Sequence, residues 1–483
     1  MGFDLQQLKN SRGLDLAVWP PRYDPKYCPS SSEEYWFPEI ECASDEERDE
    51  LIFWKLRNQL AYAWEHSPFY RHLWQQFGVS PETLKSLADL AQFPVIQKSD
   101  LRKDQEKNPP FGDLLSIQPS EIRRIHGTSG TTGRPILFGV GADDWERFSN
   151  AHARIMWSAG LRPEDQMMVC SFFSLYVGSW GALIGGERLG ATLFPFGAGA
   201  PGQTARAVEW AQYAKPTAFY GTPSYALHLA ETAQRLGIDP RSLGFRLLFF
   251  SGEPGAGIPA TKRLIEGTFA GACIDMGSMA EMTPWMTNSE CRHRTGMHLW
   301  QDLVYTELCD PITYKPVPFG SEGTPVYTHL ERRSQPMIRL ASNDQSRWVD
   351  SPCPCGRTYP RLPAGIYGRY DDMLLVRGKN IYPSAVENAL REIEGFGGEF
   401  RIIISSQEHM DELLIRAEYE NGEHSSGLND TARSSIEEKL RDRLGLRPVV
   451  ELVPPGSLAR SEFKARRAID NRDLYRKSLG KEP

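Results

Sequence analysis

The segment HGTSGTTGRP, residues 126–135, contains three glycines and four hydroxyl side chains within ten positions. Glycines let a backbone curl so that several N–H groups point at one anion. The hydroxyl groups can donate further hydrogen bonds, and Arg134 adds a fixed positive charge. The spacing matches neither the P-loop pattern GxxxxGK[ST] nor the dinucleotide fingerprint GxGxxG. Two interpretations therefore stay open, an ordinary surface turn or a loop that holds phosphate groups.

A set of cysteines and histidines has the composition of a metal site. Cys353 and Cys355 form the knuckle-like turn CPCG, and Cys291 lies upstream in ECRHRTGMH with His293 and His298. Three cysteines and one histidine would form a closed, tetrahedral and structural zinc site. We choose His298 over His293 because its separation from Cys291 leaves room for a turn. The alternative, a set of ordinary reduced thiols, stays open.

Composition excludes several classes of protein. A chain of 483 residues exceeds the size at which one hydrophobic core stops growing, so it predicts two or more domains. The net charge of -7 argues against a nucleic-acid partner. Eight cysteines do not make a disulfide scaffold in so long a chain, and the N-terminus does not read as a signal peptide. No apolar run approaches the ~18 residues that span a bilayer. We expect a cytoplasmic protein with no membrane partner.

The N-terminal segments predict an arm followed by helices. Residues 1–33 are rich in Pro, Ser and Tyr and predict an irregular arm. From Ser44 to Phe77, apolar residues recur at helical spacing with acidic residues early and a glycine at the end, which predicts one or two helices. Residues 86–103 predict another short helix and a loop.

The rest of the chain predicts an α/β fold. Helical stretches alternate with short apolar runs over residues 145–275, which favours a largely parallel sheet, and residues 320–350 predict short antiparallel strands. Beyond residues 368–383 the order helix, strand, strand, helix, strand predicts a small α+β domain. We therefore expect a large N-terminal α/β domain over residues 1–370 and a C-terminal domain over residues 371–483.

Segments spread along the chain resemble the phenylacetate–CoA ligase branch of the adenylate-forming superfamily, which includes acyl-CoA synthetases, peptide-synthetase adenylation domains and luciferase. They are EEYWFPEIE, SPFYRHL, the loop of residues 126–135, GGERLGATLFP, TPSYALHLAE, FSGEP, CPCGRT, GRYDDMLLVRGKNIYPSAVE and PPGSLARSEFKARRAID. They occur in the family's order and cover almost the whole chain after residue 33. The resemblance implies that the loop binds the triphosphate of ATP, and that the C-terminal domain is mobile.

The resemblance also implies roles for single residues. Thr128, Ser129, Thr131, Thr132 and Arg134 would bind the phosphates, with Arg134 in place of the family's usual lysine. Glu281 in ACIDMGSMAEM would bind Mg²⁺. Its context departs from the family's Tyr-Gly-x-Thr-Glu, because Gly277 and Ala280 replace the tyrosine and the threonine. An aromatic side chain expected beside the adenine is therefore missing.

Further implied roles concern the C-terminal segments and the nucleotide. Lys464 would be the catalytic lysine that reaches the carboxylate and the α-phosphate, although Phe463 stands where the family usually has glycine. Asp371 would be the hinge. The residues implied to bind adenine and ribose are Ser251, Gly252, Glu253, Pro254, Asp275, Met276, Asp344 and Arg369. Those implied to form the acyl pocket are Tyr220, Gly221, Tyr225 and Gly181, for which plain core packing is the alternative.

The activity implied by the resemblance is that of an aryl-acid–CoA ligase. ATP and an aromatic acid, such as a phenylacetate, a benzoate or an aminobenzoate, would give an acyl-adenylate. The C-terminal domain would then rotate, residues 377–383 would line the pantetheine tunnel, and the CoA thiol would attack. The cofactors implied are ATP, Mg²⁺ and CoA.

Two other functions stay open. The adenylate could pass to a carrier-protein thiol or an amine in natural-product biosynthesis, or the protein could bind a nucleotide or an acyl group without catalysis. The oligomeric state, including a homodimer, also stays open.

Overall fold

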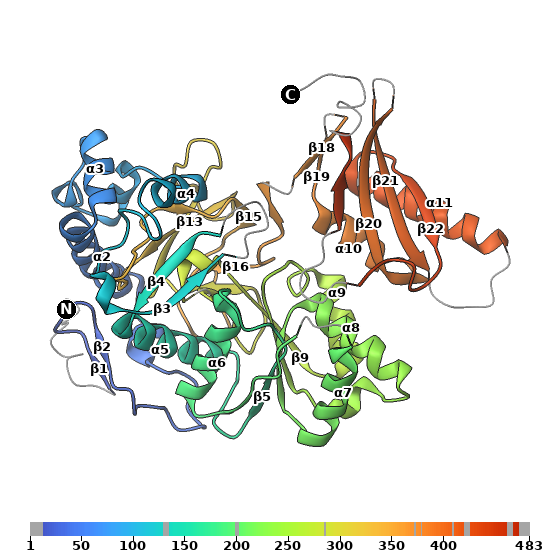
Figure 1. Ribbon diagram of the computed structural model, residues 1–483, viewed down its shortest axis with the longest axis horizontal. Coiled ribbons are helices and arrows are strands. Elements are labelled where there is room, and N and C mark those ends of the chain that lie inside the picture. Colours follow the sequence, from blue (N-terminus) through green and yellow to red (C-terminus); the bar gives the residue numbers. More distant parts are fainter. Residues whose placement is uncertain are drawn as a thin grey trace.

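A computed structural model describes residues 13–472, apart from residues 129–134, 199–201, 285, 371–372, 378, 408–409, 420–425 and 461–466. Figure 1 shows a large N-terminal part, coloured blue to yellow, and a smaller C-terminal part, coloured orange to red. The large part combines helices with a mostly parallel sheet and a smaller antiparallel sheet. The predicted fold class is confirmed.

The N-terminal region is helical after a short arm. Its elements are β1 (Leu14–Asp15), β2 (Arg22–Tyr23), α1 (Pro38–Glu41), α2 (Asp45–His66), α3 (Pro68–Gln76), η2 (Pro81–Thr83), η3 (Leu87–Gln92) and α4 (Lys98–Lys107). The helices predicted between Ser44 and Phe77 are α2 and α3. A capping box starts α2, because Ser44 accepts a hydrogen bond from the Glu47 N–H and Glu47 accepts one from the Ser44 N–H. The arm is less irregular than predicted, since β1 and β2 pair and bury Leu14.

The parallel strands of the largest sheet alternate with helices along the chain, as the sequence predicts. Its segment of the chain contains η4 (Pro119–Glu121), β3 (Ile122–Gly127), β4 (Leu137–Gly141), α5 (Ala142–Ser158), β5 (Gln166–Val169), α6 (Val177–Leu189), β6 (Thr192–Phe194), α7 (Gln203–Ala214), β7 (Ala218–Gly221), α8 (Pro223–Arg235), η5 (Pro240–Leu243), β8 (Leu247–Phe250), α9 (Pro259–Phe269) and β9 (Ala272–Gly277). Strands β5 to β9 are parallel. Figure 1 shows α5 and α6 on one face of these strands and α7, α8 and α9 on the other.

Antiparallel strands extend and flank that sheet. The elements are η6 (Ala280–Met282), β10 (Asn288–Glu290), β11 (Met297–Leu299), β12 (Val304–Cys309), β13 (Glu322–His329), β14 (Leu340–Ala341), β15 (Asp344–Arg347), β16 (Arg361–Leu362) and β17 (Gly368–Arg369). The first sheet has the order β16-β11-β10-β9-β8-β7-β5-β6, and a second sheet has the order β12-β13-β15-β17 with β14 on β13. The antiparallel strands predicted over residues 320–350 are confirmed.

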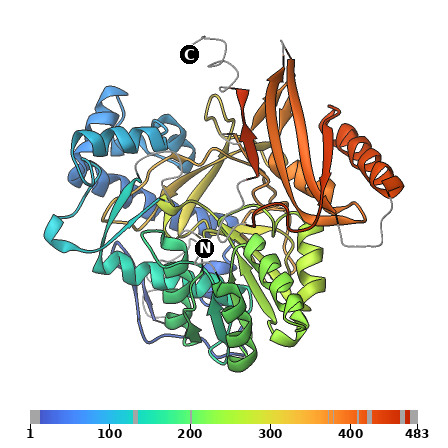
Figure 2. The ribbon, with the colours of Figure 1, turned by 45° about the vertical axis from the view of Figure 1, so that its right-hand side comes forward.

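The C-terminal domain is α+β with a hydrophobic core of its own. It consists of β18 (Leu374–Val376), β19 (Lys379–Ile381), α10 (Pro383–Arg391), β20 (Phe396–Gln407), β21 (Met410–Tyr419), α11 (Ser426–Leu444), β22 (Val449–Val453) and β23 (Ala468–Asp470). Its sheet has the order β22-β21-β20-β23, and α11 covers the face that points away from the rest of the molecule (Figure 2). Sequence analysis missed β23 and the β18–β19 ribbon, because each of these strands is only three residues long.

The parallel strands bring separate segments of the chain together. In a parallel sheet the carboxyl ends of neighbouring strands meet at one edge, and ligands of open α/β sheets bind there. Strands β7, β8 and β9 end at Gly221, Phe250 and Gly277. The predicted acyl, adenine and magnesium segments therefore begin side by side at this edge.

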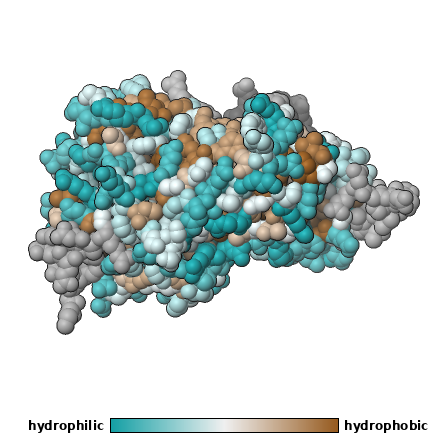
Figure 3. Space-filling view, turned by 90° about the horizontal axis from the view of Figure 1, so that it is seen from below, coloured by the Kyte–Doolittle hydropathy of each residue, from teal (hydrophilic) through white to brown (hydrophobic). Residues whose placement is uncertain are grey.

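Exposed apolar side chains form separate patches on the face drawn in Figure 3, where hydrophilic surface lies between them. In the described part of the chain, no helix is long and apolar enough to cross a membrane.

Candidate active site

The glycine-rich loop lies between two paired strands. β3 and β4 are antiparallel, and Gly127 pairs with Leu137 at the base of the loop. The Thr128 N–H donates to the Ile136 carbonyl at 3.0 Å, and Thr128 Oγ1 accepts a hydrogen bond from the Ile136 N–H at 3.1 Å. Thr128 thus closes the loop, and its own O–H remains able to donate. The other predicted loop residues, Ser129, Thr131, Thr132 and Arg134, lie outside the described residues, as do Asp371 and Lys464.

The base of the loop rests on a buried histidine. The ring of His126 stacks on Trp145 with centroids 5.3 Å apart and planes at 3°. Burial lowers the pKa of His126 to about 4. The imidazole is therefore neutral near pH 7 and adds no positive charge beside the loop.

Glu281 lies in η6, just beyond the carboxyl end of β9, and is fully buried. Lys98 Nζ, at the start of α4, is 3.2 Å from Glu281 Oε1, and Arg332 Nη1 donates to the Glu281 carbonyl at 2.8 Å. Apart from this ion pair, neither carboxylate oxygen accepts a hydrogen bond from the described residues. Buried carboxylate oxygens with unused lone pairs are ligands that Mg²⁺ prefers. Glu281 thus fits the predicted magnesium site.

Lys98 is a residue that sequence analysis missed. Its segment, VIQKSDLRKD, has the composition of an ordinary helix start, with the lysine among other charged residues. Only the tertiary contact between α4 and η6 distinguishes it from those neighbours. A cation beside Glu281 can also attract a phosphate group at the same edge of the sheet.

The residues predicted to bind the ribose lie together on neighbouring strands. Asp344 on β15 pairs with Arg369 on β17, and Arg369 Nε is 3.3 Å from Asp344 Oδ1. Ser342 Oγ accepts a hydrogen bond from the Asp344 N–H at 3.0 Å. Asn343 has a left-handed backbone with φ of 58°, and its carbonyl accepts the Tyr370 N–H. This turn presents the carboxylate and the guanidinium as a pair.

The segment predicted to run along the adenine follows β8. Ser251 is buried, Gly252 has φ of +92°, and Glu253 Oε1 accepts a hydrogen bond from the Ser224 N–H at 2.8 Å. A side chain at Gly252 would be strained in this left-handed conformation. Pro254 continues the turn toward α9. The left-handed Gly252 and the hydrogen bond to Glu253 therefore fix the backbone conformation of this segment.

Asp275 and Met276 are the last buried residues of β9. Burial, together with the nearby Glu290 carboxylate, raises the pKa of Asp275 well above its usual range. Space beside this carboxyl group is tight, because a Cβ added at Gly257 or Gly365 would lie 2.6 Å from Asp275 Oδ2. Both glycines let the backbone approach Asp275 closely.

The predicted acyl-pocket residues have different surroundings. Tyr220, on β7, lies with its hydroxyl 2.8 Å from Ser251 Oγ, and Gly221 ends that strand. Tyr225 packs in the apolar cluster between the sheet and helices α7 to α9. A Cβ added at Gly181 would lie 2.5 Å from His152 Nε2, so this glycine lets α6 pack against α5. The geometry thus brings Tyr220 close to a second predicted site residue, whereas Tyr225 and Gly181 have packing contacts.

The predicted metal ligands meet in one place. Ligand atoms of Cys291, His298, Cys353 and Cys355 all lie within 4.8 Å of one another, and all four residues are buried. His293 is exposed. Three cysteine sulfurs and one imidazole nitrogen grouped this closely fit a structural zinc ion with four protein ligands.

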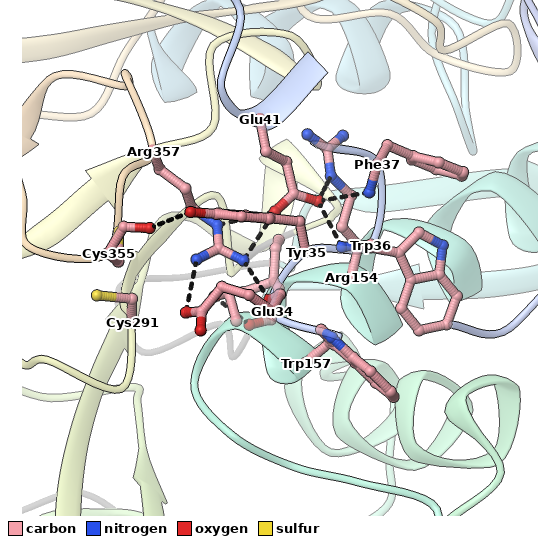
Figure 4. Close-up of polar contacts among 12 residues, drawn as sticks. Glu34, Tyr35, Trp36, Phe37, Glu41, Arg154, Trp157, Cys291, Cys355 and Arg357 are labelled. Carbon is pink, nitrogen blue, oxygen red and sulfur yellow. Dashed lines mark hydrogen bonds and ion pairs between the residues drawn. The ribbon is translucent and has the colours of Figure 1, made fainter. Parts of the chain in front are cut away.

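The cysteine knuckle also contacts the segment that follows the N-terminal arm, from Tyr35 to α1 (Figure 4). The Tyr35 hydroxyl donates to the Cys355 carbonyl at 2.8 Å. Arg357 Nε donates to Glu41 Oε2 at 2.8 Å, and Arg154 Nε donates to Glu41 Oε1 at 3.0 Å. Glu41 and Arg154 are fully buried, so the knuckle, α1 and α5 share a buried ion-pair network.

Comparison with known proteins identifies the family. A phenylacetate–coenzyme A ligase from Thermus thermophilus is 33% identical over 452 residues, covering 90% of this chain and 99% of the relative. The phenylacetate–coenzyme A ligase of Escherichia coli is 33% identical and covers 90% and 97%. The chain belongs to the phenylacetate–CoA ligase family. Residues 378–472 also match the AMP-binding enzyme C-terminal domain family. The family recognised from the sequence is confirmed.

A solved structure is more similar still. The structure of 2-hydroxyisobutyryl-CoA ligase in the postadenylation state, in complex with 2-HIB-AMP, is 50% identical with a TM-score of 0.92, covering 97% of this chain and 99% of that one. The same ligase in the thioesterification state, with 2-HIB-AMP and CoA, has a TM-score of 0.74 at 51% identity. Since the identity is nearly equal, the lower score reflects a different arrangement of the same parts.

These relatives define the reaction at the level of its class. The protein is an acid–thiol ligase that joins a carboxylic acid to CoA through an acyl-adenylate, with ATP as the second substrate. The predicted enzyme class is therefore confirmed.

Proposed function

We propose that this ligase activates a small branched 2-hydroxy acid of the 2-hydroxyisobutyrate type and transfers it to CoA. The observation that carries the proposal is the 50% identity, over 97% of the chain, to a 2-hydroxyisobutyryl-CoA ligase. The phenylacetate ligases are 33% identical or less. An aromatic acid is the second candidate, favoured by those relatives and by the resemblance seen in the sequence.

The proposed roles of the residues near the carboxyl ends of the parallel strands concern ATP and the acid. The loop of residues 128–134 would contact the triphosphate, and Asp344 with Arg369 would hold the ribose through carboxylate and guanidinium hydrogen bonds. Ser251 to Pro254, with Asp275 and Met276, would border the adenine. Lys464 would reach the acid and the α-phosphate.

Two bonds change in the first step. An oxygen of the acid carboxylate attacks the α-phosphorus of ATP, and the bond to pyrophosphate breaks. Glu281 would hold Mg²⁺, which when bound supplies positive charge that offsets the charge of the leaving pyrophosphate. Lys98, paired with Glu281, would keep that carboxylate oriented and add a second positive charge at the same place.

The second step would follow a change in arrangement. The CoA thiol attacks the acyl carbonyl, and AMP leaves. We propose that residues 1–370 and 371–483 act as two domains, that Asp371 is the hinge between them, and that residues 377–383 line the path of CoA. The two TM-scores to one ligase in two states support a rotation of this kind.

The cysteine knuckle would have a structural role. Cys291, His298, Cys353 and Cys355 supply all four ligands of a tetrahedral zinc ion, so no position remains for a substrate. The zinc would fix the turn that contacts Tyr35 and Glu41.

A panel assay tests the proposed substrate. Pyrophosphate release and CoA-thioester formation are measured with 2-hydroxyisobutyrate, phenylacetate, benzoate and an aminobenzoate, each with and without CoA. We expect the highest kcat/KM and a thioester product with 2-hydroxyisobutyrate. Preference for an aromatic acid would support the second candidate. Pyrophosphate release without any CoA product would instead favour a carrier protein or an amine as the acceptor.

A further inference from the structure

Two hydroxyl side chains meet at the carboxyl ends of β7 and β8. Tyr220 is the penultimate residue of β7, and Ser251 directly follows β8. The two strands are parallel neighbours, in which Gly221 pairs with Phe250. The Tyr220 and Ser251 oxygens are 2.8 Å apart, and the residues are 1% and 4% exposed. The pair lies at the same sheet edge as Glu281.

The hydrogen bonds of this pair are incomplete. Each hydroxyl group has one O–H donor, and a bond between two hydroxyls uses only one of the two donors. Among the described residues, neither side chain donates to any other acceptor. One buried O–H is therefore left without an acceptor, whichever group donates to the other. Buried polar groups in native proteins nearly always have a partner, so an unused donor at a ligand-binding edge indicates a ligand acceptor.

The tyrosine remains able to donate at neutral pH. Burial, together with the nearby Tyr176 phenol, raises the pKa of Tyr220 well above its usual value. Tyr220 is therefore a neutral phenol. The pair offers a donor and several lone pairs, which together match an alcohol that both accepts and donates a hydrogen bond.

We propose that Tyr220 and Ser251 bind the 2-hydroxyl group of the acid and make the enzyme prefer a 2-hydroxy acid to its deoxy analogue. This inference rests on the proposed function. The sequence analysis assigned Ser251 to the adenine site. In this proposal Ser251 lies between the adenine and the acyl group and contacts the acid. A site built to hydrogen-bond a substrate hydroxyl rejects the analogue that lacks it, because the buried partners are then left unpaired.

The test compares two acids that differ by this one group. kcat/KM for acid-dependent pyrophosphate release is measured with 2-hydroxyisobutyrate and with isobutyrate, on the full chain and on Tyr220→Phe and Ser251→Ala. We expect the unchanged enzyme to prefer the 2-hydroxy acid by more than about 100-fold. Each variant should reduce that ratio by about tenfold or more, because its loss with 2-hydroxyisobutyrate exceeds its loss with isobutyrate.

A matched control separates recognition from packing. Tyr305 on β12 is a half-buried tyrosine in the other sheet, and Tyr305→Phe should leave the ratio unchanged. If Tyr220→Phe does not fold, Ser251→Ala still tests the inference, because it removes only one oxygen atom and should not disturb the packing. An unchanged ratio in the variants, or an equal loss with both acids, would overturn the inference while the proposed function stands. If the unchanged enzyme activates only aromatic acids, the proposed function fails, and the inference falls with it.

Discussion

At the scale of single residues, the site depends on charges held away from water. Glu281 is fully buried, and its carboxylate has Lys98 as its ion-pair partner. Isolated buried charges are unfavourable, and Lys98 offsets part of the lost hydration of this carboxylate. Apart from this ion pair, neither carboxylate oxygen accepts a hydrogen bond from the described residues, which is why we propose that this buried acid holds Mg²⁺.

Glu281→Gln should lower acid-dependent pyrophosphate release by about 100-fold or more, because the amide keeps the shape of the side chain but loses the charge that holds the metal. Lys98→Met should have a smaller effect, about tenfold, since other positive groups remain. Steady-state kinetics at several Mg²⁺ concentrations measure both. The control is Glu164→Gln, an exposed acid away from the site, which should keep full activity. Full activity of Glu281→Gln at low Mg²⁺ would contradict the assignment.

At the scale of elements, the cysteine knuckle connects a turn, a short helix and a long helix. Cys355 accepts a hydrogen bond from Tyr35 through its carbonyl, and Arg357 binds Glu41, which also binds Arg154 on α5. The knuckle has little regular structure of its own, so metal ligation can supply order that its backbone lacks. Tyr35 and α1 then pack on an ordered surface.

Cys353→Ser should remove bound zinc and lower the midpoint of thermal unfolding by several degrees, because the tetrahedral site loses a thiolate. Metal content by mass spectrometry and a thermal melt measure the two effects. Cys170→Ser is the matched control, since Cys170 is also buried but lies in an apolar cluster apart from these ligands, and it should retain zinc. Purified enzyme without zinc would contradict the metal assignment directly.

At the scale of the whole molecule, the C-terminal domain contacts the large domain through charged side chains. Arg460 Nε lies 3.1 Å from Glu231 Oε2 on α8, and Arg460 also pairs with Glu418 in its own domain. Such a contact would favour one arrangement of the domains and still break in the proposed rotation, because ion pairs near the surface contribute about 0.2–1 kcal/mol. The domain arrangement that contains this contact resembles that of 2-hydroxyisobutyryl-CoA ligase in its postadenylation state, with a TM-score of 0.92.

Glu231→Gln should shift the balance between the two half-reactions by up to about fivefold, which corresponds to the loss of one partly exposed ion pair. Adenylation should slow, and transfer of preformed adenylate to CoA should quicken. Single-turnover measurements of each half-reaction test this. The control variant, Glu451→Gln, breaks a comparable pair with Arg416 inside the C-terminal sheet and should change neither rate. Equal changes in both half-reactions would show that the pair does not select between arrangements.

The sequence by itself determined the main helices, the alternation of helices with parallel strands, and their order. The period of apolar residues predicted α2, α3 and the alternation over residues 145–275, because local periodicity reports which face of an element is buried. Ordered motifs also identified the family and the cluster of Cys291, His298, Cys353 and Cys355. Three-residue strands such as β23 were not predicted, because so few residues show no periodicity.

Only the tertiary structure decided which side chains meet. Lys98 is an ordinary charged residue until α4 packs beside η6, and Tyr220 is an ordinary aromatic until β7 and β8 place it against Ser251. Glu41 likewise becomes a link between α1 and the knuckle only through Arg357. The physical reason is common to all three. Hydrogen bonds and ion pairs depend on distances of a few ångströms, and these are set by long-range packing rather than by the residues next to them in the chain.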